Sequence, residues 1–381
     1  PNCMNLFNIG GISNMKQKLL ALGAAGNKAA ILAQECGIIE GDDVLLINST
    51  TTDIPSTYGG QIFELPGNVG GTGKDRNISK RQAELVIKNN MFDLKKFLTD
   101  ESGKMVDQVI MVTSTDGGSG SGSTVVFADY IAGLGVPVMI YAFIGRAKDI
   151  RGLRNTIEFF KDLSGKKYTV QVISNEKLAE SADDTNDSAI EAKANSEFCR
   201  SLSVILGGQI SDTDVEQNLD ERELHKLRTT PGYMIVATQI FDDKIKNIEQ
   251  TRKEVTELLD TLCNPDPDNM DMARLGLIYN CEKNESSYMD ILPVVKEKFG
   301  LAFEVFTHRQ YLQKAPRVIS VIMAGLAMPM KEVQTIYEQY KDATSTINKS
   351  KDSFFDSVDK MQFDDDSMFD TGEDIDALLK L

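Results

Sequence analysis

The stretch Ser114-Thr-Asp-Gly-Gly-Ser-Gly-Ser-Gly-Ser-Thr124 decides the fold of this 381-residue chain. It follows the apolar run 108–113, which predicts a buried strand, and it leads into 124–131, which predicts a helix. Glycines let backbone N–H groups approach a ligand closely, and serine hydroxyls add donors or a route to a metal-bound water. The start of a helix supplies unpaired N–H groups and the positive end of its dipole. The stretch therefore predicts a loop that holds phosphates.

Three other kinds of glycine-rich loop are alternatives to this interpretation. A flexible Gly/Ser linker has a similar composition, but linkers seldom lie between a strand and a helix. A dinucleotide-binding loop requires GxGxxG, whereas Gly118, Gly120 and Gly122 are spaced too tightly. A Walker loop requires GxxxxGK[ST], and no lysine follows these glycines. The loop is therefore a nucleotide-loop candidate that matches neither common fingerprint.

The composition indicates an acidic globular protein. Asp and Glu number 57 and Lys and Arg 41, so the net charge of −16 argues against a general nucleic-acid or anionic-membrane binder. No apolar run approaches the roughly 20 residues that span a bilayer, and the first residues carry no signal pattern. We therefore expect a cytoplasmic protein with no direct membrane or nucleic-acid partner, long enough for two domains and a tail.

Cysteine and histidine usage excludes several kinds of site. The cysteines are odd in number and scattered, which fits free thiols in a reducing cytosol. Two histidines cannot build a His-rich zinc site, and a Ser-His-Asp hydrolase would lack its GxSxG elbow. The residues concerned are Cys3, Cys36, Cys199, Cys263, Cys281, His225 and His308.

The order of apolar and helical segments predicts an α/β fold. In the first half, strands are expected at 18–22, 44–48, 109–113, 136–143 and 168–173, with helices at 28–36, 80–88 and 123–132 between them. This alternation is typical of a largely parallel sheet, whose carboxyl edge binds ligands.

A long helix at 188–206 is expected to connect two domains, capped by Asn186 or Asp187 and ended by Gly207-Gly208. Strands at 233–239, 275–279 and 317–323 and helices at 244–262 and 288–299 predict a second, smaller α/β or α+β domain. A charged helix at 331–358 and an acidic tail follow. The tail is interpreted either as a disordered solubilising segment or as an amphipathic segment that docks on a partner.

Four further loops have the same character as the first and follow strands or precede helices. They are 22–28, 48–53, 70–76 and 145–146, and a shared sheet edge would make them one nucleotide pocket. The Gly-rich, cationic loop 70–76 suits a terminal phosphate, and Asp53 could hold magnesium through water. The candidate binding residues are Gly23, Ala24, Ala25, Gly26, Asn27, Lys28, Asn48, Thr50, Gly71, Thr72, Gly73, Lys74, Asp116, Gly117, Gly118, Ser119, Gly120, Ser121, Gly122 and Arg146.

These motifs resemble those of the tubulin/FtsZ superfamily. Gly117-Gly-Ser-Gly-Ser-Gly122 is similar to its signature loop, GGGTGSG or GGGTGTG, and Gly23-x-x-Gly26-Asn27 to its first glycine loop. Asn175-Glu-Lys-Leu178 resembles its guanine-side loop. The loop spacing and acidic tail look most like the phage and plasmid groups TubZ and PhuZ.

The resemblance implies a Rossmann-like GTP-binding domain with a parallel sheet at 1–186, a central helix at 187–213 and a catalytic loop at 214–224. It further implies a C-terminal domain at 225–330 and a C-terminal helix with acidic tail at 331–381.

The sequence departs from the family pattern in three places. Asp116 stands where the signature has glycine, Ser119 where it has threonine, and Ile144 where a glutamate usually meets the ribose. On the central helix, Asn195 carries over as the guanine-binding residue with a two-residue insertion. The aromatic that normally stacks on guanine is replaced, because Ile190 lies there.

The segment Asn218-Leu-Asp-Glu-Arg-Glu223 resembles the family's catalytic loop. The resemblance implies that Asp220 and Glu223 orient the attacking water on the next subunit's nucleotide and that Asn218 helps to close the interface. Two carboxylates three residues apart at a loop–helix junction can reach one water. The alternative is a helix N-terminus rich in stabilising acids.

The resemblance thus predicts a GTPase that binds GTP, GDP and Mg²⁺. It would polymerise head to tail into dynamic cytomotive filaments, with hydrolysis dependent on assembly, for plasmid or phage DNA segregation or phage positioning. Its partners would be further copies of itself and an adaptor or neighbouring subunit that receives the tail. The alternatives are a doubly wound, nucleotide-dependent metabolic enzyme and a non-catalytic nucleotide-binding adaptor.

Overall fold

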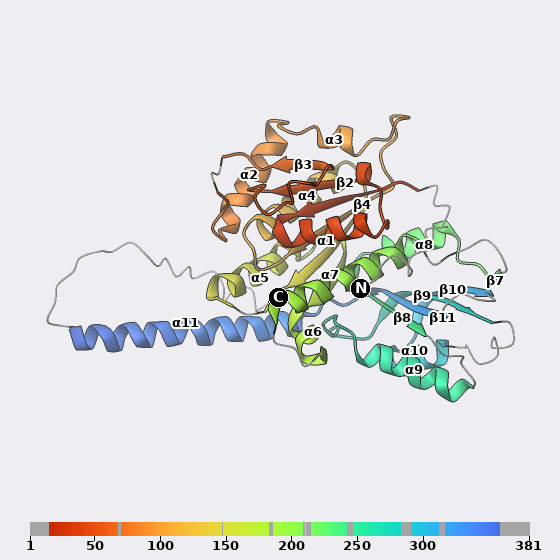
Figure 1. Cartoon of the computed structure of the whole chain (residues 1–381). Helices are drawn as coiled ribbons and strands as arrows, with labels where there is room; N and C mark the ends of the chain where they lie inside the picture. Colours follow the sequence, from red (N-terminus) through yellow and green to blue (C-terminus); the bar gives the residue numbers. More distant parts are fainter. Residues whose placement is uncertain are drawn as a thin grey trace.

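The computed structural model describes residues 15–67, 70–146, 148–182, 186–208, 210, 215–241, 247–282, 291–311 and 317–358. Its first half alternates strands and helices (Figure 1). The elements are β1 (Gln17–Leu22), α1 (Gly23–Glu35), β2 (Val44–Asn48), β3 (Gln61–Glu64), α2 (Arg76–Lys88), α3 (Leu94–Phe97), β4 (Gln108–Ser114), α4 (Ser119–Gly133), β5 (Val138–Ile144), α5 (Ile150–Leu163), β6 (Thr169–Ser174) and α6 (Asn175–Ala182).

A long central helix leads into the second half. The elements there are α7 (Asp187–Ile205), β7 (Val215–Gln217), α8 (Glu221–Arg228), β8 (Gly232–Phe241), α9 (Ile248–Asp260), β9 (Met272–Cys281), α10 (Leu292–Phe299), β10 (Ala302–Tyr311), β11 (Arg317–Leu326) and α11 (Met330–Val358). Asn186 caps α7 by accepting from the backbone N–H groups of Ser188 and Ala189, as predicted. The far end of α11 extends away from the rest of the molecule (Figure 1).

The described strands form one sheet in the order β3-β2-β1-β4-β5-β6-β8-β11-β9-β10-β7. Strands β1 to β6 all pair in parallel, whereas β11 runs antiparallel to β8 and β9. Helices cover both faces. One core layer contains residues of α1, α6, α7 and α8, and the other contains residues of α2, α4, α5, α9, α10 and α11. Burial on both sides explains why the parallel strands are continuously apolar.

The two halves meet at the outer edge of β6. Residues Thr169, Val170 and Gln171 pair in parallel with the start of β8. Farther along β6, the backbone N–H of Ser174 donates to Cys263 O at 2.9 Å, and Asn264 Nδ2 donates to Val172 O at 2.6 Å. The whole edge of β6 is therefore hydrogen-bonded to the second half.

The predicted strands are confirmed within three residues at their starts and at their ends. Helix α2 begins at Arg76 rather than residue 80. Two helices with glycines in their first turns also begin earlier than predicted, α1 at Gly23 rather than residue 28 and α4 at Ser119 rather than residue 123. Glycine disfavours helix interiors, so the sequence pattern placed the helices after the glycines. Close packing decides otherwise, because a Cβ on Gly26 would lie 2.2 Å from Val112 O on β4.

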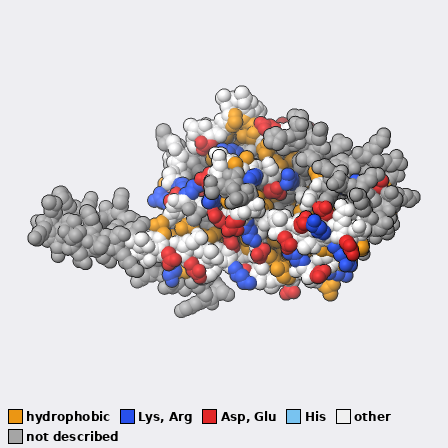
Figure 2. Space-filling view, turned by 60° about the horizontal axis from the view of Figure 1, so that its bottom comes forward, with side chains coloured by type: hydrophobic (Ala, Val, Ile, Leu, Met, Phe, Trp, Pro, Cys, Tyr) orange, Lys and Arg blue, Asp and Glu red, His pale blue; other side chains and the backbone are white. Residues whose placement is uncertain are grey.

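Several elements were not predicted, among them α5, α6, β3 and β10. The charged helix at 331–358 is confirmed as α11, and the acidic tail after it lies outside the described residues. The face that carries α9, α10 and α11 shows Asp and Glu interspersed with Lys and Arg (Figure 2). On that face, neither sign of charge forms one continuous patch.

Candidate functional site

A cavity of about 410 Å³ lies at the carboxyl ends of β1, β2, β4, β5 and β6, beside the first half of α7. The strand ends and the loops after them bring together most of the predicted segments. Lining residues from the prediction are Gly23, Ala24, Ala25, Lys28, Asn48, Thr50, Asp53, Gly71, Thr72, Asp116, Gly117, Gly118, Ser119, Gly120, Arg146, Asn175, Ile190 and Asn195.

The glycine loops touch one another, which explains their composition. Gly23 has φ +76°, and a Cβ there would lie 2.9 Å from Gly120 N. A Cβ on Gly118 would lie 2.3 Å from Thr72 Oγ1 and 2.8 Å from the carbonyl carbon of Lys74. The hydroxyls of Ser49 and Ser119 also hydrogen-bond across two of the loops. These four loops therefore form one continuous cradle that larger side chains would separate.

The first turn of α4 opens onto the cavity through Gly118, Ser119 and Gly120. Gly118 is its N-cap and offers no side-chain acceptor, so the first N–H groups of the helix stay available to a ligand. Ser121 and Gly122 do not line the cavity. Instead the Ser121 hydroxyl donates to Gly117 O, and the Ser123 hydroxyl donates to Ser119 O at 2.6 Å. These hydroxyls fasten the helix start rather than face a ligand.

The opposite end of the cavity combines polar and apolar groups that suit a base and sugar. Asn175 Oδ1 is buried and has no hydrogen-bond partner among the described residues. Arg146 pairs with Glu176 at 3.2 Å and with Asp187 at 3.4 Å. Hydrogen bonding to Lys148, followed by the charges of Lys148 and Arg146, lowers the pKa of Asp187.

Some lining residues were not among the predicted candidates. Ser49, Gly70, Ser114 and Gly145 lie within the predicted loops, whereas Phe143, Lys148, Asp187, Glu191 and Ala194 lie outside them. Most of these residues lie next to predicted residues in the sequence. Their place in or beside the same loops was the signal that could have found them. Phe143 is the last residue of the predicted strand 136–143 and contributes an aromatic ring at this end.

Four more predicted binding residues do not line the cavity. Gly26 packs against β4, as described above. Asn27 is 1% exposed, and both polar atoms of its side chain lack partners among the described residues. The Lys74 ammonium pairs with Asp149, the N-cap of α5, and Gly73 O accepts from Arg151 Nη1 at 2.9 Å. The structure thus directs the loop cation toward α5.

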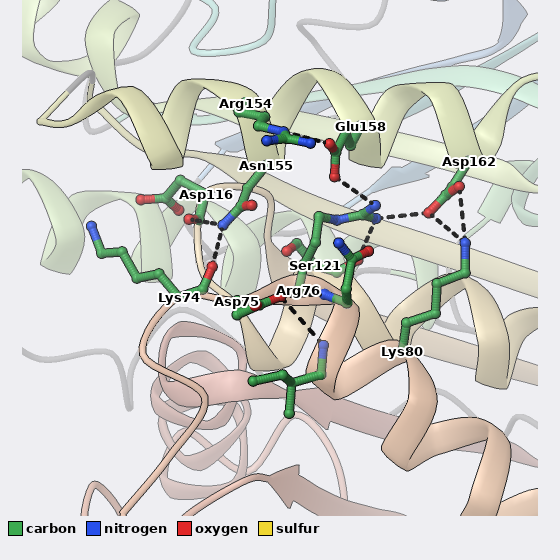
Figure 3. Close-up of polar contacts among 12 residues, drawn as sticks. Lys74, Asp75, Arg76, Lys80, Asp116, Ser121, Arg154, Asn155, Glu158 and Asp162 are labelled. Atoms are coloured by element: carbon green, nitrogen blue, oxygen red, sulfur yellow. Dashed lines mark hydrogen bonds and ion pairs between the residues drawn. The ribbon is translucent and has the colours of Figure 1, made fainter. Parts of the chain in front are cut away.

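Asp116 lies where the loop meets the turn after β5. A Cβ on Gly145 would lie 2.6 Å from Asp116 Oδ2, so the carboxylate occupies space that only glycine leaves free. Burial raises the pKa of Asp116, and the charges of Lys74 and Lys148 and a hydrogen bond from Ser114 oppose the rise. Figure 3 shows its side chain near Lys74, on the α5 side of the loop.

The predicted catalytic loop lies away from this cavity. None of Asn218, Asp220 and Glu223 lines it. Asp220 is the N-cap of α8 and forms a capping box: its Oδ1 accepts from Glu223 N at 2.8 Å, and Glu223 Oε2 accepts from Asp220 N at 3.1 Å. The acids therefore stabilise the helix start in this chain.

Neighbouring contacts hold this loop at the opposite edge of the sheet. Leu219 is 1% exposed and donates from its backbone N–H to His308 Nδ1 at 3.4 Å. The Glu221 carboxylate accepts from Met15 N at 2.6 Å, just before β1 begins. Asn218 and Asp220 remain exposed. Since the cavity lies at the carboxyl end of β1, the loop and the cavity are at opposite ends of that strand.

Two general features of the described residues bear on ligands. No three His, Cys, Asp or Glu side chains in the described ranges gather into a metal-binding group. None of the helices that the structure describes is both long and apolar enough to cross a membrane.

Comparison with known proteins identifies the fold. No family profile and no curated protein matches the sequence. TubZ of Clostridium botulinum phage c-st superposes with a TM-score of 0.67 at 19% identity, over 87% of this chain and 98% of that one. A GTPγS-form protofilament of TubZ from Bacillus thuringiensis serovar israelensis gives 0.72 at 16%, over 90% and 94%. An empty FtsZ dimer from M. jannaschii gives 0.63 at 16%, over 82% and 89%. The chain therefore has the tubulin/FtsZ fold, which confirms the resemblance of its signature loop.

Proposed function

We propose that this chain is a tubulin-like GTPase that binds GTP and GDP in the cavity and polymerises head to tail into dynamic filaments. The glycine cradle, the helix start at Gly118 and the unpartnered Asn175 Oδ1 support a nucleotide with phosphates at one end and a base at the other. A relative with this fold was solved as a GTPγS-form protofilament, which supports both nucleotide and assembly.

The observation that carries the proposal is the separation, by α7, of the cavity from the predicted catalytic loop. The first half of this 19-residue helix lines the cavity, and Asp220 lies beyond its other end. At about 1.5 Å per residue, the helix is about 28 Å long. Asp220 therefore cannot reach a nucleotide in its own chain, but it lies exposed where a second copy could present its cavity. A head-to-tail contact of this kind repeats without closing, so filaments result.

Within such a contact, Asp220 and Glu223 would orient the attacking water and accept its proton, and Asn218 would contact the neighbouring subunit. Catalysis of phosphoryl transfer rests mainly on positioning and on neutralising charge. We propose Asp220 and Glu223 as the catalytic pair and 214–224 as the catalytic loop.

Magnesium fits this site as a companion of the phosphates. The described residues supply no group of three ligands, but Asp53 and the Thr50 hydroxyl line the cavity and could hold its water molecules. Bound magnesium would neutralise phosphate charge. The protein's own part is to hold the phosphates with the N–H groups of the cradle.

The cellular role that we propose is the segregation of plasmid or phage DNA, or phage positioning, in the bacterial or infected-host cytoplasm. The partners would be neighbouring copies and an adaptor that receives the acidic tail. The proposal includes a GTP-binding domain at 1–186, a central helix at 187–213, a C-terminal domain at 225–330 and a C-terminal helix with acidic tail at 331–381.

Two measurements test the function. GTPase activity per subunit should rise with protein concentration, together with polymer that pellets in GTPγS. Activity strictly proportional to concentration, with no polymer, would refute assembly-dependent hydrolysis.

The shared active site needs a sharper test. Asp220→Asn is loaded with γ-labelled GTP and mixed, for one turnover, with excess wild type loaded with unlabelled GTP. If the neighbour's loop completes the site, wild-type loops release the label from the variant's cavities. Label retained in mixed filaments would contradict this. Wild type kept below its assembly concentration is the control for nucleotide exchange.

A further inference from the structure

Helix α5 holds the Gly-rich segment 70–76 against the signature loop (Figure 3). At one end, the Asp149 carboxylate pairs with the Lys74 ammonium, and Arg151 donates to Gly73 O. At the other end, Arg76 donates to Ser121 O at 3.1 Å. Its guanidinium also pairs with Asp162 at 2.7 Å and with Glu158 at 3.3 Å, both on α5. One helix and its N-cap therefore contact Gly73, Lys74 and Arg76 of the segment.

Asn155 is the central contact between α5 and the two loops. Its side-chain Nδ2 donates to Lys74 O at 2.9 Å, Asp116 O at 3.0 Å and Gly117 O at 3.2 Å. Asn155 is 4% exposed, so water does not readily replace these bonds. A single amide group thus joins the carbonyls of the Gly-rich segment to those of the signature loop.

The Gly-rich segment needs such a restraint more than the signature loop does. Lys74 has φ +64°, a conformation that non-glycine residues adopt at a cost, and Gly70, Gly71 and Gly73 also have positive φ. The signature loop is instead continuous with β4 and α4, and Thr115 N donates to Phe143 O at 2.9 Å. Loss of the Asn155 bonds should therefore release mainly segment 70–74.

We propose that Asn155 is a positioning residue that sets the preference of this site for a nucleoside triphosphate over a diphosphate. This inference rests on the proposed function. Gly70, Gly71 and Thr72 line the cavity, and Thr72 Oγ1 would lie 2.3 Å from a Cβ on Gly118, the N-cap of α4. The segment that Asn155 holds is thus placed for the terminal phosphate, which a diphosphate lacks.

The test compares equilibrium binding of GTPγS and GDP to full-length wild type, Asn155→Ala and Asn155→Asp. The alanine removes the donors, and the aspartate turns an acceptor toward three carbonyls. Lys161→Ala is the matched control, because Lys161 lies exposed on the same helix and its side chain makes no bond to the loops among the described residues. Thermal unfolding monitors folding of each variant.

In Asn155→Ala we expect the preference for GTPγS over GDP to fall about tenfold, equivalent to about 1.4 kcal/mol. Asn155→Asp should lose at least as much, and Lys161→Ala should keep the wild-type ratio. A parallel loss of both affinities, or an unchanged ratio, would overturn the inference while leaving the nucleotide site intact. Wild type that binds neither nucleotide would overturn the proposed function as well. If the aspartate variant fails to fold, Asn155→Ala decides alone.

Discussion

The carboxylate of Asp220 has two roles to separate, one as the cap of α8 and one in hydrolysis on the next subunit. Asp220→Asn keeps an oxygen that can accept from Glu223 N, now 2.8 Å away, and leaves the Asp220 N–H bond to Glu223 in place. Asparagine caps helices about as well as aspartate, so the free energy of unfolding should change by less than about 0.5 kcal/mol. Asp220→Ala removes the acceptor and should cost about 1 kcal/mol.

Hydrolysis should respond differently. Both variants lose the carboxylate that would accept a proton, so the GTPase rate should fall about 100- to 10,000-fold in each. Assembly with GTP should persist, and the filaments should become long-lived. Urea unfolding, phosphate release and sedimentation measure the three quantities. Glu249→Gln removes an exposed acid from the first turn of α9 and serves as the charge-matched control.

The stabilities and GTPase rates of Asp220→Asn and Asp220→Ala together distinguish the two roles. Two stabilities that differ while both rates collapse would support a catalytic carboxylate. A wild-type rate in Asp220→Asn would refute the reasoning and leave Asp220 as a helix cap. A loss of rate that merely follows the loss of stability would refute it too.

Three further predictions follow from the cavity. Gly118→Ala places a Cβ 2.3 Å from Thr72 Oγ1 and 2.8 Å from the carbonyl carbon of Lys74. Nucleotide affinity should therefore fall at least tenfold. An unchanged affinity in a nucleotide titration would contradict the close contact. Asn175→Ala removes a buried acceptor that has no described protein partner. GTP affinity should therefore fall about tenfold, while the stability of the apo protein in urea stays the same or rises. A loss of stability without a loss of affinity would argue against a base contact. Burial raises the pKa of Asp116 above 3.8, so ionisation of its carboxyl group costs stability as the pH rises from about 4. The neutral variant Asp116→Asn should therefore gain stability relative to wild type above about pH 4. A difference in urea unfolding that does not depend on pH would contradict this.

Local patterns predicted the parallel sheet and the loops at its edge, because each strand–loop–helix unit carries its own apolar run and glycines. Helix α5 escaped prediction although it has a clear apolar face with Leu153, Ile157 and Phe160 buried. Gly152 in its first turn is a poor helix former and weakens the helical pattern just after the N-cap, Asp149.

The site was predicted by kind of residue but not by direction of side chain. Lys74 and Ser121 have the chemistry of phosphate ligands, yet Lys74 pairs with Asp149 and Ser121 bonds within α4. Which way a loop side chain turns depends on α5 and on the loops packed beside it, which lie far apart in sequence. The oddity of Asp116 has the same origin, because the space it fills is provided by Gly145 on another loop.

The closed edge of β6 has a consequence for fragments of this protein. A chain cut after α7 would lose β8 and the 263–264 segment, and with them the hydrogen bonds to Thr169–Ser174. An apolar central strand would then become an open edge, which is a template for intermolecular pairing. We expect the isolated first half to aggregate rather than to fold as a free nucleotide-binding module. Asn175, which directly follows β6, would lose its fixed position with it.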